Sequence, residues 1–103
     1  VLSPVLKVAD LTLNQITREV RRGDSLIDLT PKEYALLEYF IINEGQVLTR
    51  TMISEHVWNY DFDPMTNIID VHINHLRSKI DKGFSPKLIH TVKGVGYVLK
   101  EKN

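Results

Sequence analysis

The sequence contains no cysteine, and this absence limits the kinds of site that its 103 residues can form. Disulfide bonds, thiol nucleophiles and Cys-containing zinc or iron–sulfur sites are all excluded. The lack of cysteine fits a reducing compartment without requiring one. The length fits a single domain that can bury a modest core.

Long apolar runs are also missing, and so is a start methionine. No run approaches the roughly 18 residues that a membrane span needs, so we expect no membrane contact. The opening residues, VLSPVLKV, lack the basic segment and apolar core of a signal peptide. Because no methionine stands at the start, we expect a fragment of a longer chain or a processed chain.

The motifs of known catalytic sites are also missing. The sequence has no P-loop, nucleophile elbow or H-E-x-x-H motif, so we expect no enzyme. The G-x-G of VKGVGYV lacks the third glycine and the following helix of a dinucleotide site. Its glycines indicate a tight hairpin turn with little bulk around Lys93, which can then approach a backbone phosphate. A turn whose lysine contacts nothing is the alternative.

Neither sign of charge dominates the chain, but its two parts differ. Thirteen Lys and Arg balance thirteen Asp and Glu. Residues 1–64 carry six Lys/Arg against ten Asp/Glu, whereas residues 65–103 carry seven against three. This asymmetry indicates that the C-terminal part faces an anion, with chance as the alternative.

The first 29 residues indicate an antiparallel meander of short strands. LKVAD, LTLN, TREVRR and SLIDL are separated by polar or Gly-containing breaks, and several have near-alternating polarity. The pattern then becomes helical: Thr30 can cap a helix that begins at Pro31, and Glu33 completes a capping box. Gly45 stands where the C-terminal cap of this helix is expected.

Two further helices and a hairpin follow. A short helix capped by Thr49 is predicted to end near Trp58, and a longer one to run from about Thr66 to Lys82, ended by Gly83. KLIHTVKGVGYVLK indicates two strands around a turn. This order predicts one α+β winged helix-turn-helix domain over residues 1–103, with a β-sheet over 1–29 and the helix-turn-helix and wing over 30–103. In helix-turn-helix proteins the recognition helix lies in the DNA major groove.

The third helix has two contrasting faces. At about 100° per residue, one face is a core stripe of Ile69, Ile73, Leu76 and Ile80. The opposite face has no acid at its centre and carries Asn67, Val71, Asn74, His75, Ser78 and Lys82. Amides and hydroxyls suit base edges, an apolar Val71 suits a thymine methyl, and the flanking Arg77 suits a phosphate. An ordinary solvated face is the alternative.

His72 and His75 stand three residues apart on this helix, a spacing that would let both reach one metal ion. A zinc site normally takes three or four protein ligands, and no further pair is apparent because His56 and His90 are isolated. The sequence therefore predicts no metal and no cofactor. We expect His72 to be partly buried with one hydrogen-bond partner and His75 to point outward.

Several separated motifs, taken in order, resemble one known family. TPKEYALLEYFIINEGQVLTR, HVW, TNIIDVHINHLRSKI and LIHTVKGVGYVL look like the C-terminal DNA-binding (effector) domain of OmpR/PhoB-family two-component response regulators. The resemblance covers about residues 6–100. VWNYDFD, TNIIDVHI and KIDKGFSPKLI are similar to the heavy-metal-response subgroup. The resemblance implies a four-stranded N-terminal antiparallel sheet, three helices and a C-terminal β-hairpin wing.

The resemblance also implies bacterial, cytoplasmic transcription regulation and a set of partners. An upstream receiver domain, phosphorylated by a sensor kinase, would precede Val1 and is absent from this chain. Family members bind direct-repeat half-sites of double-stranded DNA as head-to-tail homodimers. In some members the loop between the second and third helices contacts RNA polymerase, and here that loop matches Asn59, Tyr60, Asp61, Phe62 and Asp63. From the residues alone, this loop could equally be cover for the core.

Single positions carry over from the family by their place in the motifs. The base-reading residues match Asn74, His75 and Ser78. The DNA-backbone contacts match Trp58, Thr66, Asn67, Arg77, Thr91 and Lys93. Many members have arginine where this chain has Asn74 and His75, a departure that predicts weaker phosphate attraction and a different target sequence. Together with the neutral net charge, this departure predicts modest DNA affinity for one copy of the domain and tight binding only when two copies bind together.

We therefore expect a sequence-specific double-stranded DNA-binding domain for transcription regulation. It would be the output domain of a phosphorylation-controlled two-component response regulator. The alternative from another class is a winged-helix protein-interaction module without DNA binding, and a histidine metal-binding domain is a remote third.

Overall fold

The computed structural model describes residues 4–58 and 68–101, and its N-terminal part is a four-stranded antiparallel sheet. The strands, in spatial order, are β1 (Val5–Val8), β2 (Leu11–Asn14), β3 (Val20–Arg22) and β4 (Ser25–Ile27). Along β2, buried and half-exposed side chains alternate, so Leu11 and Leu13 face the core. The sheet confirms the predicted meander.

Helix α1 (Pro31–Ile42) begins as its sequence predicts. The Thr30 hydroxyl accepts from the Glu33 N–H, and the Glu33 carboxylate accepts from the Thr30 N–H, which is the reciprocal capping box. The predicted cap at Gly45 is wrong. The helix ends earlier, at a C-cap formed by Asn43, and Gly45 follows at φ +85° where the chain leaves the helix.

Helix α2 (Arg50–Ile53) is short and continues into a π-helical turn, η1 (Ser54–Trp58). The Thr49 hydroxyl accepts from the backbone N–H three residues on, at 3.1 Å, so the predicted N-cap is confirmed. Ile53 and Val57 are both buried, as their helical spacing predicts.

Helix α3 (Ile68–Ile80) buries the predicted stripe completely, since each of four side chains is 0 % exposed: Ile69, Ile73, Leu76 and Ile80. The predicted start at Thr66 lies outside the described residues. The helix ends two residues before the predicted Lys82, and Gly83 follows at φ +82°.

The C-terminal hairpin consists of β6 (Ile89–Val92) and β7 (Gly96–Leu99). It carries a third strand that the sequence did not predict. β5 (Leu48–Thr49) pairs antiparallel with β7, giving the order β5-β7-β6. A two-residue strand is too short to show an alternating pattern. Gly96 permits this pairing, because a Cβ there would lie 2.1 Å from the Leu48 carbonyl oxygen.

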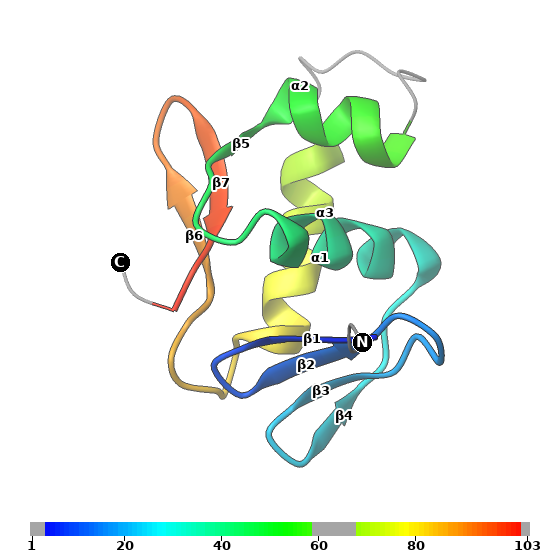
Figure 1. Ribbon diagram of the computed structural model, residues 1–103. Coiled ribbons are helices and arrows are strands. Elements are labelled where there is room, and N and C mark those ends of the chain that lie inside the picture. The colour runs from blue at the N-terminus through cyan, green and yellow to red at the C-terminus, as the bar shows by residue number, and fades with distance from the viewer. Residues whose placement is uncertain (1–3, 59–67, 102–103) are drawn as a thin grey trace.

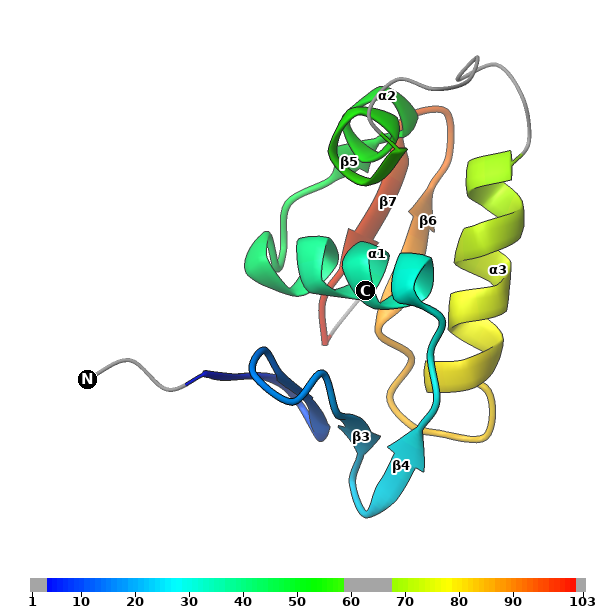
Figure 2. The ribbon, with the colours of Figure 1, turned by 90° about the vertical axis from the view of Figure 1, so that its right-hand side faces the viewer.

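The three helices pack together with both sheets around one core. Helix α1 lies between the N-terminal sheet and α2, with the three-stranded sheet beside it (Figure 1). In Figure 2, α3 runs along one edge of the molecule, with α1 and the hairpin on its inner side. One core cluster joins side chains from both sheets and all three helices. The architecture is the predicted α+β winged helix-turn-helix.

Candidate nucleic-acid interface

The outward face of α3 is not covered by any element of the described chain (Figure 2). Asn74, His75 and Ser78 are exposed, and Val71 is 40 % exposed. The structure therefore brings the four predicted base-reading residues to one side of the helix, opposite the buried stripe. Their role in reading bases stays a prediction.

The hydrogen bonds on this face determine what it can offer to a partner. The Ser78 hydroxyl donates to the His75 carbonyl oxygen at 2.7 Å. Because this bond uses the hydroxyl hydrogen, the oxygen retains lone pairs that can accept from a base amino group. A neutral His75 ring has one donor and one acceptor nitrogen. The face can thus both donate to and accept from base edges.

Arg77 joins α3 to the hairpin. Its Nη1 donates to Thr91 Oγ1 on β6 at 3.0 Å, and its Nη2 donates to Asn74 Oδ1 at 2.9 Å. The guanidinium also lies 5.6 Å from the centre of the Tyr97 ring on β7. These contacts fix a positive charge at the junction of α3 and the wing, and a pre-organised guanidinium suits a phosphate.

Asp70 ties the beginning of α3 to two other elements. The Tyr97 hydroxyl on β7 donates to its carboxylate, and Arg50 Nε of α2 donates to the same oxygen at 3.1 Å. Partial burial alone would raise the pKa of Asp70, but the bonds from Tyr97 and Arg50 hold it below its usual value. Burial and the bond to Asp70 raise the pKa of Tyr97. Sequence reasoning missed this cluster, because no local pattern joins residues 20 and 27 positions apart.

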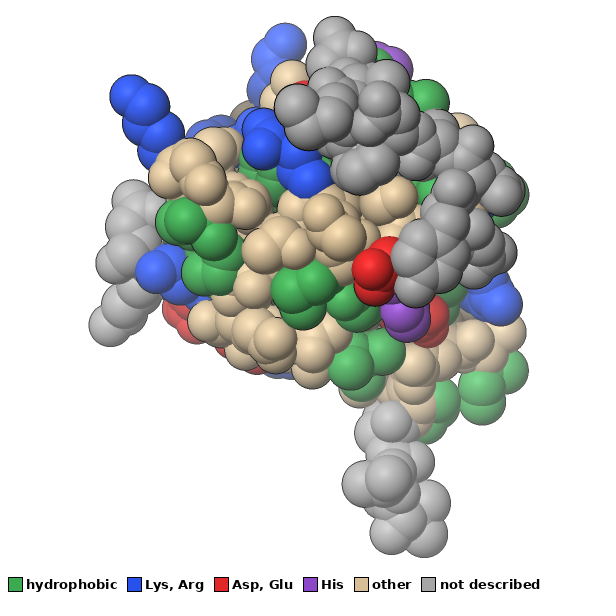
Figure 3. Space-filling view, turned by 90° about the horizontal axis from the view of Figure 1, so that it is seen from above, with side chains coloured by type: hydrophobic (Ala, Val, Ile, Leu, Met, Phe, Trp, Pro, Cys, Tyr) green, Lys and Arg blue, Asp and Glu red, His purple; other side chains and the backbone are tan. Residues whose placement is uncertain are grey.

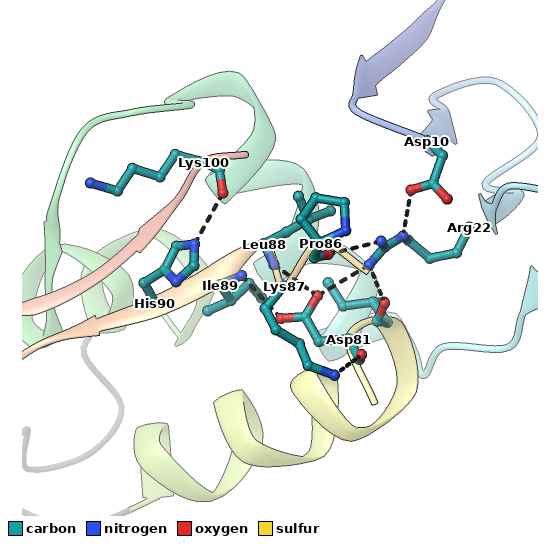
Figure 4. Close-up of polar contacts among 10 residues, drawn as sticks. Asp10, Arg22, Asp81, Pro86, Lys87, Leu88, Ile89, His90 and Lys100 are labelled. Carbon is teal, nitrogen blue, oxygen red and sulfur yellow. Dashed lines mark hydrogen bonds and ion pairs between the residues drawn. The ribbon is translucent and has the colours of Figure 1, made fainter. Parts of the chain in front are cut away.

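Arg22 and Asp81 fix the other end of α3 (Figure 4). The fully buried Arg22 guanidinium donates to the Ile80 carbonyl at 2.6 Å and to the Asp81 carboxylate at 3.3 Å. It also donates to Asp10 at 2.8 Å and to the Pro86 carbonyl at 2.9 Å. One side chain of β3 thereby holds the end of α3 and the segment that leads into the hairpin.

Glu33 of the capping box has a second partner on α3. Lys79 Nζ donates to its carboxylate at 2.6 Å. Burial would raise the pKa of Glu33, but the bonds from Lys79 and the Thr30 backbone outweigh it and hold the pKa below its usual value. The pair connects the beginning of α1 with the last turn of α3.

The rings of His72 and Trp58 both lie toward the core. His72 is half-buried, and its ring meets the Trp58 ring edge-on at a centroid distance of 5.0 Å. Trp58 is only 9 % exposed, and Lys32 Nζ lies 5.6 Å from its ring centre. The expected partial burial of His72 is confirmed. The proposed backbone contact of Trp58 could use only the exposed margin of the ring.

The wing presents Thr91 and Lys93 as exposed side chains. Lys93 precedes Gly94, whose φ of +78° marks the tight turn that the glycines predict. Seen from above, most Lys and Arg side chains in view lie on the hairpin side of the molecule (Figure 3). The positions Thr66, Asn67 and Asn59 to Asp63 lie outside the described residues.

Within residues 4–58 and 68–101, no group of three or more His, Asp or Glu side chains could hold a metal ion. His56 instead stacks on Tyr39, with ring centroids 3.9 Å apart. Among the described helices, none is long and apolar enough to cross a membrane.

Comparison with known proteins places this chain in a family. Residues 23–99 match the family model "Transcriptional regulatory protein, C terminal". The chain belongs to this family. Its relatives are OmpR/PhoB-type response regulators, and the family is one of transcription regulators rather than of enzymes.

Two relatives and one solved structure illustrate the likeness. Response regulator MprA of Mycobacterium sp. (strain KMS) is 52% identical over 99 residues, 96% of this chain and 43% of that protein. Transcriptional regulatory protein PcoR of Escherichia coli is 53% identical over 96 residues, 93% of this chain and 42% of that protein. The chain thus spans less than half the length of these relatives. The Klebsiella pneumoniae RstA DNA-binding domain, solved in complex with the RstA box, has a TM-score of 0.85 at 25% identity, covering 95% of this chain and 98% of that chain.

Proposed function

We propose that this domain binds double-stranded DNA in a sequence-specific manner and regulates transcription. The observation that carries the proposal is the exposed face of α3, where Asn74, His75 and Ser78 lie beside an arginine held against the wing. Side chains that both donate and accept suit base edges, and a fixed guanidinium suits the backbone. The likeness to RstA, whose domain was solved with its DNA box, supports the same function.

The docking that follows puts α3 in the major groove. Asn74, His75, Ser78 and Val71 then meet base edges. Arg77 and Thr91 contact the backbone at the junction of helix and wing, and Lys93 at the hairpin turn reaches the neighbouring backbone or the minor groove. Trp58, Thr66 and Asn67 are proposed as further backbone contacts.

Selection of binding sites from random duplexes tests this function. Selection should yield a defined target sequence. His75→Ala should then relax the preference at one or two base pairs of that sequence, at a cost of about 1–3 kcal/mol of binding free energy. A gel shift on the selected duplex gives the affinity. If His75→Ala weakens binding to all sequences equally, His75 is a phosphate contact. No retardation of any duplex at low salt would favour a protein-interaction module instead.

The partners of the longer protein are a further part of the proposal. The relatives are named response regulators, so we infer an upstream receiver domain controlled by a sensor kinase, in a cytoplasmic regulator. Two copies would bind direct-repeat half-sites as a head-to-tail dimer. The loop from Asn59 to Asp63 would contact RNA polymerase, and its replacement should abolish activation of transcription while leaving DNA binding intact. The heavy-metal-response subgroup stays a prediction.

A further inference from the structure

A hollow of about 550 Å³ lies between the C-terminal half of α3 and strand β6. Six polar or charged side chains are among those that line it: Arg77, Ser78, Lys82, Lys87, His90 and Thr91. Three of the six come from α3 or the residues just after it, and three from the hairpin and the segment leading into it. Ser78 belongs both to the hollow and to the proposed base-reading face, so the two surfaces are continuous.

The hollow is cationic, although the chain as a whole has no net charge. Arg77, Lys82 and Lys87 face one carboxylate among the lining residues, that of Asp81. Asp81 is buried, and its two oxygens accept from backbone N–H groups of the segment that enters β6, at 3.1 Å each. It is also paired with Arg22 (Figure 4). Because these partners already neutralise the Asp81 carboxylate, it offsets little of the positive charge of the lysines and arginine that line the hollow.

The walls of the hollow are held in place by hydrogen bonds. Lys87 Nζ donates to the Asp81 carbonyl oxygen at 2.6 Å, so it lies at the C-terminal end of α3, where the helix dipole favours a cation (Figure 4). His90 Nε2 lies 3.1 Å from the Lys100 carbonyl oxygen. The bond from Arg77 to Thr91 spans the gap between helix and hairpin.

The proposed docking gives this gap a particular place on DNA. With α3 in the major groove and the hairpin turn at the adjacent minor groove, the sugar–phosphate strand that separates the two grooves must pass between helix and hairpin. The hollow lies in that gap. Arg77 and Thr91, already proposed as backbone contacts, form part of its wall.

We infer that the hollow seats a backbone phosphate of this separating strand, with Lys82 and Lys87 as its cationic ligands. This inference rests on the proposed DNA-binding function and adds two contacts to it. Lysine binds phosphate as a point charge without a demanding bidentate geometry. Lys82 lies just after α3 and Lys87 Nζ lies at the same end of the helix, so the two ammonium groups can share one oxyanion. The contacts carry no sequence information and set register and affinity.

Two lysine variants and one matched control test the inference. Lys82→Ala and Lys87→Ala are compared with Lys7→Ala, which removes an exposed lysine from β1 of the N-terminal sheet. Binding to the selected duplex is measured over a range of salt concentrations. Because the two lysines share one phosphate, their removal together should lower the slope of log K against log salt by about one unit, and each variant should account for part of this change and weaken binding to all sequences alike. Lys7→Ala should change neither quantity.

A scan with neutral methylphosphonates along the duplex then locates the phosphate. One neutral position should weaken binding by the wild type but add less to the loss in Lys82→Ala, because the contact between Lys82 and that phosphate is already gone in the variant. Hollow variants that behave like Lys7→Ala, while the wild type still retards the duplex, would overturn the inference alone. Inorganic phosphate that fills the hollow without displacing the duplex would also overturn it. A wild type that retards no duplex would overturn the proposed function itself.

Discussion

Among single residues, Arg77 shows how one departure from the family pattern changes the α3 surface. Asn74 stands three residues before Arg77, at a position where the family resemblance leads us to expect arginine in many members. Two like charges at this spacing repel, whereas the Asn74 amide accepts from Arg77 Nη2 at 2.9 Å. The departure therefore removes one cation and fixes the remaining one more firmly. We expect a surface that relies less on unspecific phosphate attraction and more on the orientation of Arg77.

Gly96 gives a prediction about stability at a single position. In Gly96→Ala the new Cβ would lie 2.1 Å from the Leu48 carbonyl oxygen and 2.9 Å from Thr49 Cα, both backbone atoms of β5. Because backbone cannot move aside cheaply, the variant should lose about 2–3 kcal/mol of unfolding free energy. Urea denaturation followed by circular dichroism measures the loss.

Gly83→Ala is the matched control for this prediction. Gly83 has a φ of +82°, but a Cβ there would meet no heavy atom within 4 Å. It should cost only the backbone strain, about 1 kcal/mol. If Gly96→Ala is no more destabilising than Gly83→Ala, the close approach of β5 to β7 is wrong.

At the scale of elements, helix α3 is fixed at both ends by charged side chains from other parts of the fold. Arg22 holds its C-terminal end, and the buried Asp81 is left without this cation in Arg22→Met. Leaving a buried charge unpaired costs about 3–5 kcal/mol, so the variant should be strongly destabilised in urea titration. The double variant Arg22→Met/Asp81→Asn should recover part of this loss. A loss below about 1 kcal/mol in the single variant would contradict the role of the pair.

The N-terminal end of α3 gives the molecule a defined acid sensitivity. The pKa of Asp70 lies below its ordinary value of 3.8, so the folded state binds this proton more weakly than the unfolded state. The stabilisation is therefore complete above pH 3.8 and is lost as the pH falls through the lower, folded-state pKa. Asp70→Asn should be less stable at neutral pH by on the order of 1 kcal/mol, with a flatter loss of stability on acidification.

Denaturant titrations at several pH values between neutral and acid check this prediction. Asp24→Asn, an exposed carboxylate in the turn between β3 and β4, is the control and should leave the curve unchanged. If the stabilities of Asp70→Asn and the wild type fall in parallel as the pH is lowered, Asp70 is not the titrating group.

For the whole molecule, local sequence patterns predicted the features that depend on interactions between residues close together in the chain. The Thr30 capping box, the Thr49 cap and the buried stripe of α3 depend on residues a few positions apart, and all three are present. The exposed face of α3 follows from the same periodicity. Strand β5 and the partners of Arg22 and Asp70 depend on contacts between distant segments. No spacing rule reports such contacts, so the way the interface is held together could not be predicted.

The distribution of charge leads to a prediction about how copies of the domain bind DNA. The net charge is zero, so affinity must come from the few cations gathered at the helix–wing junction. If Arg77 and Lys93 each neutralise one phosphate and Lys82 and Lys87 share a third, a single copy should show a salt slope of about −2.7, from about −0.9 per phosphate. A duplex with two direct-repeat half-sites should double this slope and bind far more tightly. Fluorescence anisotropy on one-site and two-site duplexes measures both quantities, and equal slopes on the two duplexes would show that only one copy binds.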